Sequence, residues 1–161
     1  MPPKRITAFV LLPLSKGMFA KISPCDAERV APHSWIAAWS GTAWYAKCGK
    51  CGYLHRFLMD APAGSLVDHI NGDTLDCRRE NLRFATPRQS VGNIKIRKDN
   101  TSGYRGVTWH KRGGKWNARI HNDGRVVSLG LFDDVEDAAR AYDVAAREWF
   151  GPEFARLNFP D

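Results

Sequence analysis

The 161 residues carry a net charge of +7 at neutral pH, with 43% hydrophobic and 25% charged residues, which is the balance of a globular chain and not of a disordered one. The length suffices for one ordinary domain or for two to three small ones. No apolar run approaches the roughly 20 residues of a membrane span, so we expect no membrane partner.

The positive charge is concentrated in the middle of the chain. Residues 78–125 hold thirteen Lys and Arg against three Asp and Glu, so this window carries +10 and the remainder carries −3. Such a distribution is typical of a protein that binds a polyanion. On charge alone, a solvated basic face without a partner is the alternative.

The first 60 residues are predicted to be rich in short strands. An apolar run near the N-terminus is broken by Pro13 and is too short for a signal peptide, so we interpret it as a strand and expect a cytoplasmic protein. Turn residues separate the predicted strands, which span residues 6–14, 18–22, 42–47 and 52–58. The tryptophans of this region are expected to pack in the core or on the sheet, namely Trp35, Trp39 and Trp44. His55 is expected to be a structural histidine that supports the following segment.

Four cysteines raise the question of a metal or a disulfide. The segment Cys48-Gly-Lys-Cys51 is a turn of the zinc-knuckle type, but a structural zinc ion needs four ligands, usually including a second closely spaced pair. The remaining candidates, Cys25, His55 and Cys77, are scattered along the chain. A structural Zn²⁺ at Cys48 and Cys51 is therefore not expected, and we favour a hairpin turn with reduced thiols.

Residues 65–94 are predicted to form a strand, a loop, a second strand and a helix. The strands span residues 65–69 and 82–85, with a polar turn at residues 71–73 and a helical turn at residues 76–80 between them. Thr86 is expected to cap the helix, with Pro87 at its first position. A basic connector follows over residues 95–101.

The C-terminal residues are predicted to form a hairpin sheet and one long helix. The strands span residues 104–110, 115–121 and 125–132, and the Asp-Gly pair before the last one favours a tight turn. The helix is expected to begin after Asp133 as its N-cap and to end at Gly151-Pro152, with apolar residues at the helical period between them. The predicted fold class is α+β, with a small β-rich N-terminal region, a ββα unit, and a three-stranded antiparallel sheet packed on one C-terminal helix.

The pair Asp68-His69 indicates chemistry on phosphodiesters. A carboxylate holds a hard cation such as Mg²⁺ or Mn²⁺ through oxygen, and a neighbouring imidazole takes a proton from water near neutral pH. Successive side chains of a strand point to opposite faces, so both residues can serve one phosphate only if the strand ends or bulges there. Asn81 lies twelve residues after His69 and is suited to hydrogen bonding across the loop.

The segments Asp68-His69-Ile70-Asn71-Gly72 and Asn81-Leu82-Arg83 resemble the HNH endonucleases, particularly the homing group encoded by phages and introns. The resemblance implies a ββα metal unit that hydrolyses phosphodiester bonds in duplex DNA. It assigns His69 as the general base that activates water, gives Asn81 a structural role among the catalytic residues, and gives Asp68 and a later helix residue to the metal. It also implies a protein encoded by a phage or a mobile element and acting in the cytoplasm of a bacterial host.

One position departs from the family pattern. The family usually carries asparagine or histidine where this chain has Ser90, and Asn93 lies one turn further along the same helix face. Ser90 and Asn93 are therefore both candidates for the second metal ligand. Because a serine hydroxyl is the weaker ligand, a non-cleaving DNA-binding protein or transcriptional regulator with a degenerate HNH unit is the alternative function.

Residues 102–160 resemble the plant ethylene-response-factor type of DNA-binding domain, the Apetala-2 fold. The resemblance lies in Gly103-Tyr104-Arg105-Gly106-Val107, Lys115-Trp116, Leu129-Gly130-Leu131-Phe132, residues 137–143 and Leu157-Asn158-Phe159-Pro160. It implies that the open sheet face enters the major groove of double-stranded DNA. Trp109 remains open between a core residue and a groove contact.

Strand alternation places basic and polar side chains on that open face, away from Trp116, Ala118 and Ile120. With two arginines of the ββα unit, the predicted DNA contacts are Arg83, Arg88, Arg105, His110, Arg112, Lys115, Asn117, Arg119, His121 and Arg125. The predicted domains are residues 1–94 (a lead-in over 1–60 and the ββα unit over 65–94), a linker over 95–101, and residues 102–161. We expect a monomer on DNA without a small-molecule substrate. An RNA-directed nuclease is disfavoured, because the deep major groove of A-form RNA excludes a sheet.

Overall fold

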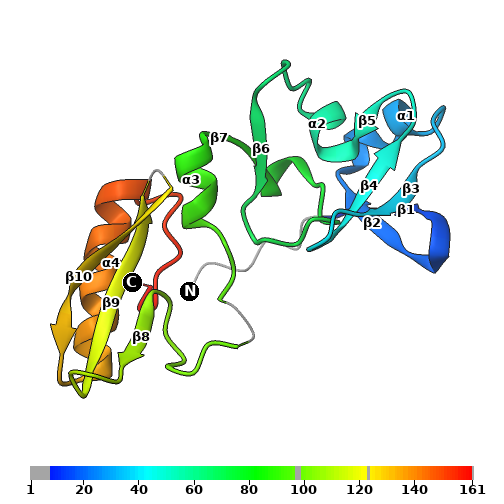
Figure 1. The fold of residues 1–161 in the computed structure, drawn as a ribbon. Coiled ribbons are helices and arrows are strands. Elements are labelled where there is room, and N and C mark those ends of the chain that lie inside the picture. The colour runs from blue at the N-terminus through cyan, green and yellow to red at the C-terminus, as the bar shows by residue number, and fades with distance from the viewer. Residues whose placement is uncertain (1–7, 97–98, 123, 161) are drawn as a thin grey trace. The chain divides into compact units, whose positions relative to one another are not determined.

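The computed structural model describes residues 8–96, 99–122 and 124–160, and the chain divides into two compact units (Figure 1). The units are Met1–Ala85 and Thr86–Asp161, and each is described by itself. The predicted α+β class is confirmed, with several small antiparallel sheets and a C-terminal helix on a three-stranded sheet. Within the described ranges, no helix is both long and apolar enough to cross a bilayer.

The first unit consists of three small antiparallel sheets joined by short helices. Strands β1 (Val10–Pro13) and β2 (Phe19–Ile22) form a hairpin, β3 (Ile36–Trp39), β4 (Trp44–Cys48) and β5 (Gly52–Tyr53) form a second sheet, and β6 (Leu66–His69) pairs with β7 (Leu82–Ala85). The helices are α1 (Ala27–Val30) and α2 (Leu54–Leu58), with single 3₁₀ turns at Ser15–Gly17, Pro24–Asp26 and Arg79–Asn81. The core brings together Ala20, Ile22, Val30, Trp35, Ala46, Leu54, Leu58 and Leu82.

Two expectations for the first unit are corrected. Residues 52–58 were predicted as one strand, but only β5 is extended and α2 follows it. Leu54, His55 and Leu58 are buried while Arg56 between them is only half-buried, which fits one face of a helical turn and not the alternation of a strand. Strand β3 and helix α1 were not predicted, and residues 6 and 7 of the first predicted strand lie outside the described residues.

The tryptophans of the first unit differ in burial. Trp35 packs in the core as predicted, and its Nε1 donates to the carbonyl of Val30 at 3.1 Å. Trp39 is 55% exposed and packs on Trp44, with ring centroids 5.3 Å apart. The expectation of core packing is therefore right for Trp35, while Trp39 packs on the surface of the sheet.

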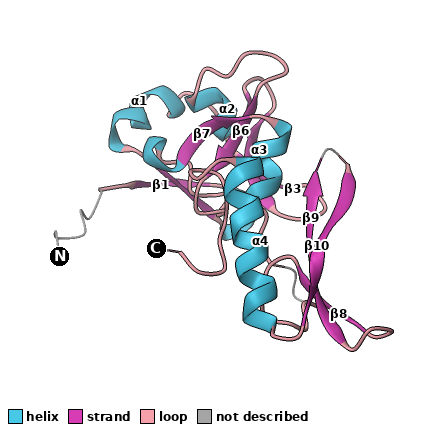
Figure 2. Ribbon diagram, turned by 90° about the vertical axis from the view of Figure 1, so that its left-hand side faces the viewer, coloured by secondary structure: helices cyan, strands magenta, loops and turns pink. Residues whose placement is uncertain are grey.

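The second unit is a three-stranded antiparallel sheet with a long helix on one face (Figure 2). Its elements are α3 (Pro87–Gly92), β8 (Val107–His110), β9 (Lys115–Asn122), β10 (Arg125–Phe132) and α4 (Val135–Phe150), with β9 in the centre of the sheet. Val107, Ala118 and Ile120 face α4 and pack on its small side chains, Ala138, Ala139, Ala145 and Ala146. The alanines allow the close approach of helix and sheet.

The predicted ends of the helices are confirmed with one shift. Thr86 and Gln89 form a reciprocal capping box before α3, with Pro87 at the first turn. The cap of α4 is Asp134 and not Asp133, because the Asp134 carboxylate accepts from the backbone N–H groups of Glu136 (2.7 Å) and Asp137 (3.2 Å). Gly151 ends α4 with φ +87°, a conformation that favours glycine.

Helix α3 packs on α4 within the second unit. A Cβ on Gly92 would lie 2.7 Å from the Phe150 ring, and the Arg156 N–H donates to the Gly92 carbonyl at 3.1 Å. By these contacts α3 belongs with the sheet that follows it in the chain. The domain boundaries at residues 94 and 102 remain predictions.

Candidate functional site

His69 is the last residue of β6, and it is 4% exposed. The ring of His55 lies against it with centroids 4.9 Å apart, and the Tyr45 ring lies 6.2 Å away. The Cys77 sulfur lies 3.8 Å from the Nε2 atom of His69. The imidazole is thus positioned by side chains from β4, α2 and the loop after β6.

Burial controls the protonation of the groups around His69. Burial lowers the pKa of His69, against the opposing charges of Asp68 and Asp73, and lowers the pKa of His55 to about 3. Burial also raises the pKa of the Cys77 thiol to about 12. Both imidazoles are therefore neutral near pH 7, which is the form of histidine that accepts a proton.

Asp68 lies beside His69 but points to the opposite face of β6. The register of β6 on β7 is regular through His69 opposite Leu82, so the strand does not bulge, and it ends at His69. The Asp68 carboxylate accepts from the Nε (3.1 Å) and terminal nitrogen (2.9 Å) of Arg83, its partner across the strands. The sequence predicted that the strand must end or bulge at Asp68-His69, and β6 does end there.

Asn81 closes the loop that follows His69. Its Oδ1 accepts from the Asn71 N–H at 2.9 Å, and its Nδ2 donates to the Asn71 Oδ1 at 3.0 Å and to the Asp76 carbonyl at 2.7 Å. The backbone adds a bond from the Ile70 N–H to the Asn81 carbonyl at 2.8 Å. These contacts make Asn81 a positioning residue for the loop that begins at His69.

Asp76 is a buried carboxylate that sequence reasoning missed. It is 1% exposed and accepts from the Nδ2 of Asn71 at 2.9 Å and from the Nε and a terminal nitrogen of Arg78, both at 2.7 Å. Burial acts to raise the pKa of Asp76, but the bonds from Arg78 and Asn71 outweigh it, and the pKa is lowered. The Asn-Gly-Asp turn could have pointed to this carboxylate, because Asn71 of that turn hydrogen-bonds both Asn81 and Asp76.

Ser90 and Asn93, the two candidates for the second metal ligand, lie in the second unit. Ser90 is half-buried in α3, and Asn93 is the buried residue that follows the helix. Asp68 belongs to the first unit, so the completion of a metal site by Ser90 or Asn93 remains a prediction.

The open face of the second unit carries the predicted DNA contacts of β9. The strand alternates between Ala118 and Ile120, which are buried against α4, and Arg119 and His121, which are exposed. On β8, His110 lies on the same face as Arg119 and His121, and its Nδ1 accepts from the Gly113 N–H at 3.1 Å. Arg88, Arg112 and Arg125 are also exposed.

Several other predicted contacts have partners within the chain. Lys115 pairs with Asp133 at 3.1 Å, and the Asn117 Oδ1 lies 3.0 Å from the Ser128 hydroxyl. The Arg105 guanidinium donates to the Ile94 carbonyl. Arg105 thus contacts the segment that follows α3.

Trp109 lies on the same face of the sheet as Trp116, its partner across the strands, with ring centroids 4.9 Å apart. This is the face that packs on α4. Trp109 is nevertheless 46% exposed. Trp109 therefore packs at the edge of the helix-covered face and does not lie on the open face that would contact a DNA groove.

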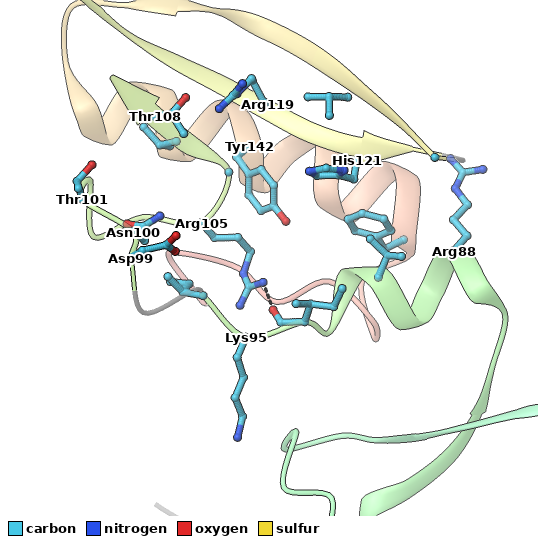
Figure 3. Close-up of a pocket in the computed structure, with 18 residues that line it drawn as sticks. Arg88, Lys95, Asp99, Asn100, Thr101, Arg105, Thr108, Arg119, His121 and Tyr142 are labelled. Carbon is cyan, nitrogen blue, oxygen red and sulfur yellow. Dashed lines mark hydrogen bonds between the residues drawn. The ribbon is translucent and has the colours of Figure 1, made fainter. Parts of the chain in front are cut away.

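A hollow of about 650 Å³ opens beside Val107, where β8 begins. Beyond the partner of Val107, β9 continues without a β8 neighbour, and the segment after α3 lies along this edge. Figure 3 shows Arg88, Arg119 and His121 around the hollow, with Arg105 directed to the segment near Lys95. The hollow therefore joins apolar walls, such as Val91 and Phe150, to exposed cations.

Two family models match this chain in the two regions just described. The HNH endonuclease model matches residues 60–91, and the AP2 domain model matches residues 102–152. An HNH endonuclease of Acanthamoeba polyphaga mimivirus is 31% identical over 159 residues, which cover 95% of this chain and 81% of the viral protein. The chain belongs to the HNH endonuclease family and carries an AP2 domain.

Other relatives match parts of this HNH–AP2 chain. Protein 3.8 of Escherichia phage T7 is 36% identical over 97 residues, which cover 60% of this chain and 78% of the phage protein. The APETALA2-like protein 2 of rice is 49% identical over 59 residues, 37% of this chain but only 13% of the plant protein. The plant likeness therefore concerns the AP2 domain alone.

The HNH family implies a divalent metal ion, and the chemistry of the donor set fits one. The carboxylate of Asp68 offers the kind of oxygen ligand that hard cations prefer. A metal at Asp68 would share this carboxylate with Arg83 or displace the guanidinium.

Proposed function

We propose that this HNH–AP2 protein is a metal-dependent endonuclease that hydrolyses phosphodiester bonds in duplex DNA. The observation that carries the proposal is the buried, neutral His69 at the end of β6, directly after the Asp68 carboxylate. A neutral imidazole in this position accepts a proton from the attacking water. Asn81 and Asp76 hold the loop that positions His69.

The metal, which we propose to be Mg²⁺ or Mn²⁺, would be held by Asp68 together with Ser90 or Asn93. When bound, it offsets the charge that develops on the phosphate and the leaving oxygen. Arg83 lies beside Asp68 and would take a phosphate oxygen if the metal displaces it from the carboxylate. Such an enzyme acts where duplex DNA is found, which for the proposed phage or mobile-element origin is the cytoplasm of a bacterial host.

The AP2 sheet would position this chemistry on DNA. The exposed cations of the open face, with Arg88 beside the hollow, suit phosphate contacts that fix the register of a protein on a duplex. Asn117 and Ser128 lie side by side on the same face and offer polar groups for base edges. We propose that one chain binds as a monomer, because it carries a single AP2 sheet.

The test is cleavage of supercoiled plasmid by the purified protein with Mg²⁺ or Mn²⁺, beside an EDTA control. We expect metal-dependent nicking or linearisation, and a decrease of about 10²–10⁴-fold in His69→Ala, the usual contribution of a general base. Arg140→Ala, which removes an exposed arginine of α4 and retains the HNH residues, serves as the control. Equal cleavage by His69→Ala and the unaltered protein contradicts the assignment of the base.

One observation favours a second candidate, a DNA-binding regulator with a non-cleaving HNH unit: Ser90 stands where the family pattern has a stronger ligand. Tight DNA binding without cleavage in either metal would establish this alternative.

A further inference from the structure

A cluster of metal-binding side chains lies in the first unit, apart from the Asp68 pair. The ring nitrogen of His33 and the sulfurs of Cys48 and Cys51 lie within 4.8 Å of one another. Cys48 ends β4, Cys51 lies in the turn before β5, and His33 lies in the connection between α1 and β3. Sequence spacing did not reveal the cluster, because His33 comes fifteen residues before Cys48 and was not among the candidates.

The geometry of the turn matches a metal knuckle. Cys48 and Cys51 are separated by two residues, Gly49 and Lys50, in the turn between β4 and β5. Gly52 follows with φ +75°, the left-handed conformation that lets the chain fold back beneath Cys51. Two cysteines at this spacing on a tight turn are the arrangement that structural zinc sites use.

The positions of the three ligand atoms require only a small adjustment. In a tetrahedral zinc site, with bonds of about 2.3 Å to sulfur and about 2.0 Å to nitrogen, ligand atoms lie roughly 3.5–3.8 Å apart. The three ligand atoms lie up to 4.8 Å apart, so they would need to approach one another by about 1 Å to bind the ion. Aromatic neighbours hold the His33 ring, with the Phe57 centroid at 5.3 Å and the Trp35 centroid at 6.2 Å.

We propose that His33, Cys48 and Cys51 bind one Zn²⁺ ion, with water in the fourth position beside the partly exposed Cys51. Two thiolates and an imidazole select zinc over the oxygen-preferring Mg²⁺ and Mn²⁺. A hollow of about 360 Å³ next to Cys51, lined by Arg29, Tyr53 and Asp60, has room for that water. The proposal departs from the sequence expectation that no structural zinc binds at Cys48 and Cys51, because the fold adds His33 to the pair.

The ion would act as a structural crosslink. It joins the connection before β3 to the β4–β5 turn, and the chain runs from this turn directly into α2, which carries His55 against His69. A unit with such short strands gains stability from a bound metal, since binding to the folded state alone raises its stability. The proposal does not depend on DNA cleavage.

The test uses the full-length protein, stripped with a chelator under reducing conditions and then reconstituted with Zn²⁺ or Co²⁺. After desalting we expect one zinc per chain, thiolate-to-cobalt charge-transfer absorption in the Co²⁺ form, and a melting temperature more than about 5 °C higher with zinc than without it. The charge-transfer band reports sulfur ligands, so metal at Asp68 does not contribute to it.

Cys51→Ser and His33→Ala should lose the zinc, the band and the thermal shift, while Cys25→Ser, at an exposed cysteine, should keep all three. Should either variant fail to fold, alkylation of the unaltered protein decides: zinc should protect Cys48 and Cys51, but not Cys25, from iodoacetamide. Failure to retain zinc with reduced thiols, full zinc binding by Cys51→Ser, or a Cys48–Cys51 disulfide in protein isolated without reductant overturns the proposal.

Discussion

The two units use polar side chains in different ways. Around His69 in the first unit, Asn81 and Asp76 are buried and hydrogen-bonded, and the neighbouring His55 is buried as well. On the sheet of the second unit, Arg119 and His121 extend from the surface. Buried polar networks hold groups in fixed positions although their burial costs desolvation, whereas exposed polar side chains stay available to a partner. The first unit therefore holds its polar groups in place, and the second presents them to solvent.

The largest expected effect tests whether the two units fold independently. Gly106 has φ +71°, and a Cβ there would lie 2.0 Å from the Tyr142 ring and 2.7 Å from the Arg119 carbonyl. Gly106→Ala should destabilise the second unit by about 4 kcal/mol through backbone strain and overpacking. Hydrogen exchange followed by mass spectrometry should show loss of protection in residues 107–150 and native protection in β6 and β7.

Gly103→Ala is the matched control for this change. Gly103 also has a positive φ, +77°, but nothing lies within 4 Å of its added Cβ. We expect a cost of about 1–2 kcal/mol from strain alone. Equal destabilisation by both variants, or loss of protection in β6, would contradict separate packing of the two units.

The next effect concerns one residue type in the two settings. Asn81→Ala removes three hydrogen bonds in a buried loop and should lower the free energy of unfolding by about 3 kcal/mol. Asn117→Ala on the open sheet face should change it by about 0.5 kcal/mol or less. Urea denaturation measures both, and similar costs would remove the contrast between a structural network and a binding surface.

The pH dependence of stability follows from His55. Its folded pKa of about 3 lies below the unfolded value near 6.5, so between these values the unfolded chain binds more protons and stability falls as pH falls. Between pH 7 and pH 5 this group should cost the first unit about 2 kcal/mol. His55→Phe keeps a ring but cannot titrate, so urea denaturation at the two pH values should show a smaller loss. A loss of the same size in that variant would exclude His55 as its source.

The smallest expected effect concerns the exposed cations. Arg119→Ala should weaken binding to duplex DNA about fivefold, on the order of 1 kcal/mol, and reduce the salt dependence of the affinity by about one unit if the contact is to phosphate. Stability should not change. Arg140→Ala removes the same charge from the exposed side of α4. It is the control and should leave the affinity for duplex DNA unaltered. Fluorescence anisotropy over a salt series distinguishes the two, and equal behaviour would mean that the open face does not contact DNA.

Much of the second unit could be predicted from its sequence, because its signals are local. The apolar period of α4, the glycine at its end and the alternation of β9 each act within a few residues. The shift of the N-cap from Asp133 to Asp134 shows the limit of such signals, since either aspartate satisfies the pattern and only the backbone conformation selects one. In the first unit, α2 was missed because Leu54 and Leu58, four residues apart, lie on one face in either a strand or a helix.

The sequence by itself determined the Asp68-His69 motif, the AP2 pattern and the sites where strands turn, since these depend on neighbouring residues. The tertiary structure decided that His55 and Cys77 contact His69, that Asn71 joins Asn81 to Asp76, and that His33 meets Cys48 and Cys51. These contacts join residues on different elements, and the burial of His69 keeps it in the neutral form that the proposed chemistry requires. Only tertiary packing brings such residues together, because their spacing in the sequence does not encode the contacts.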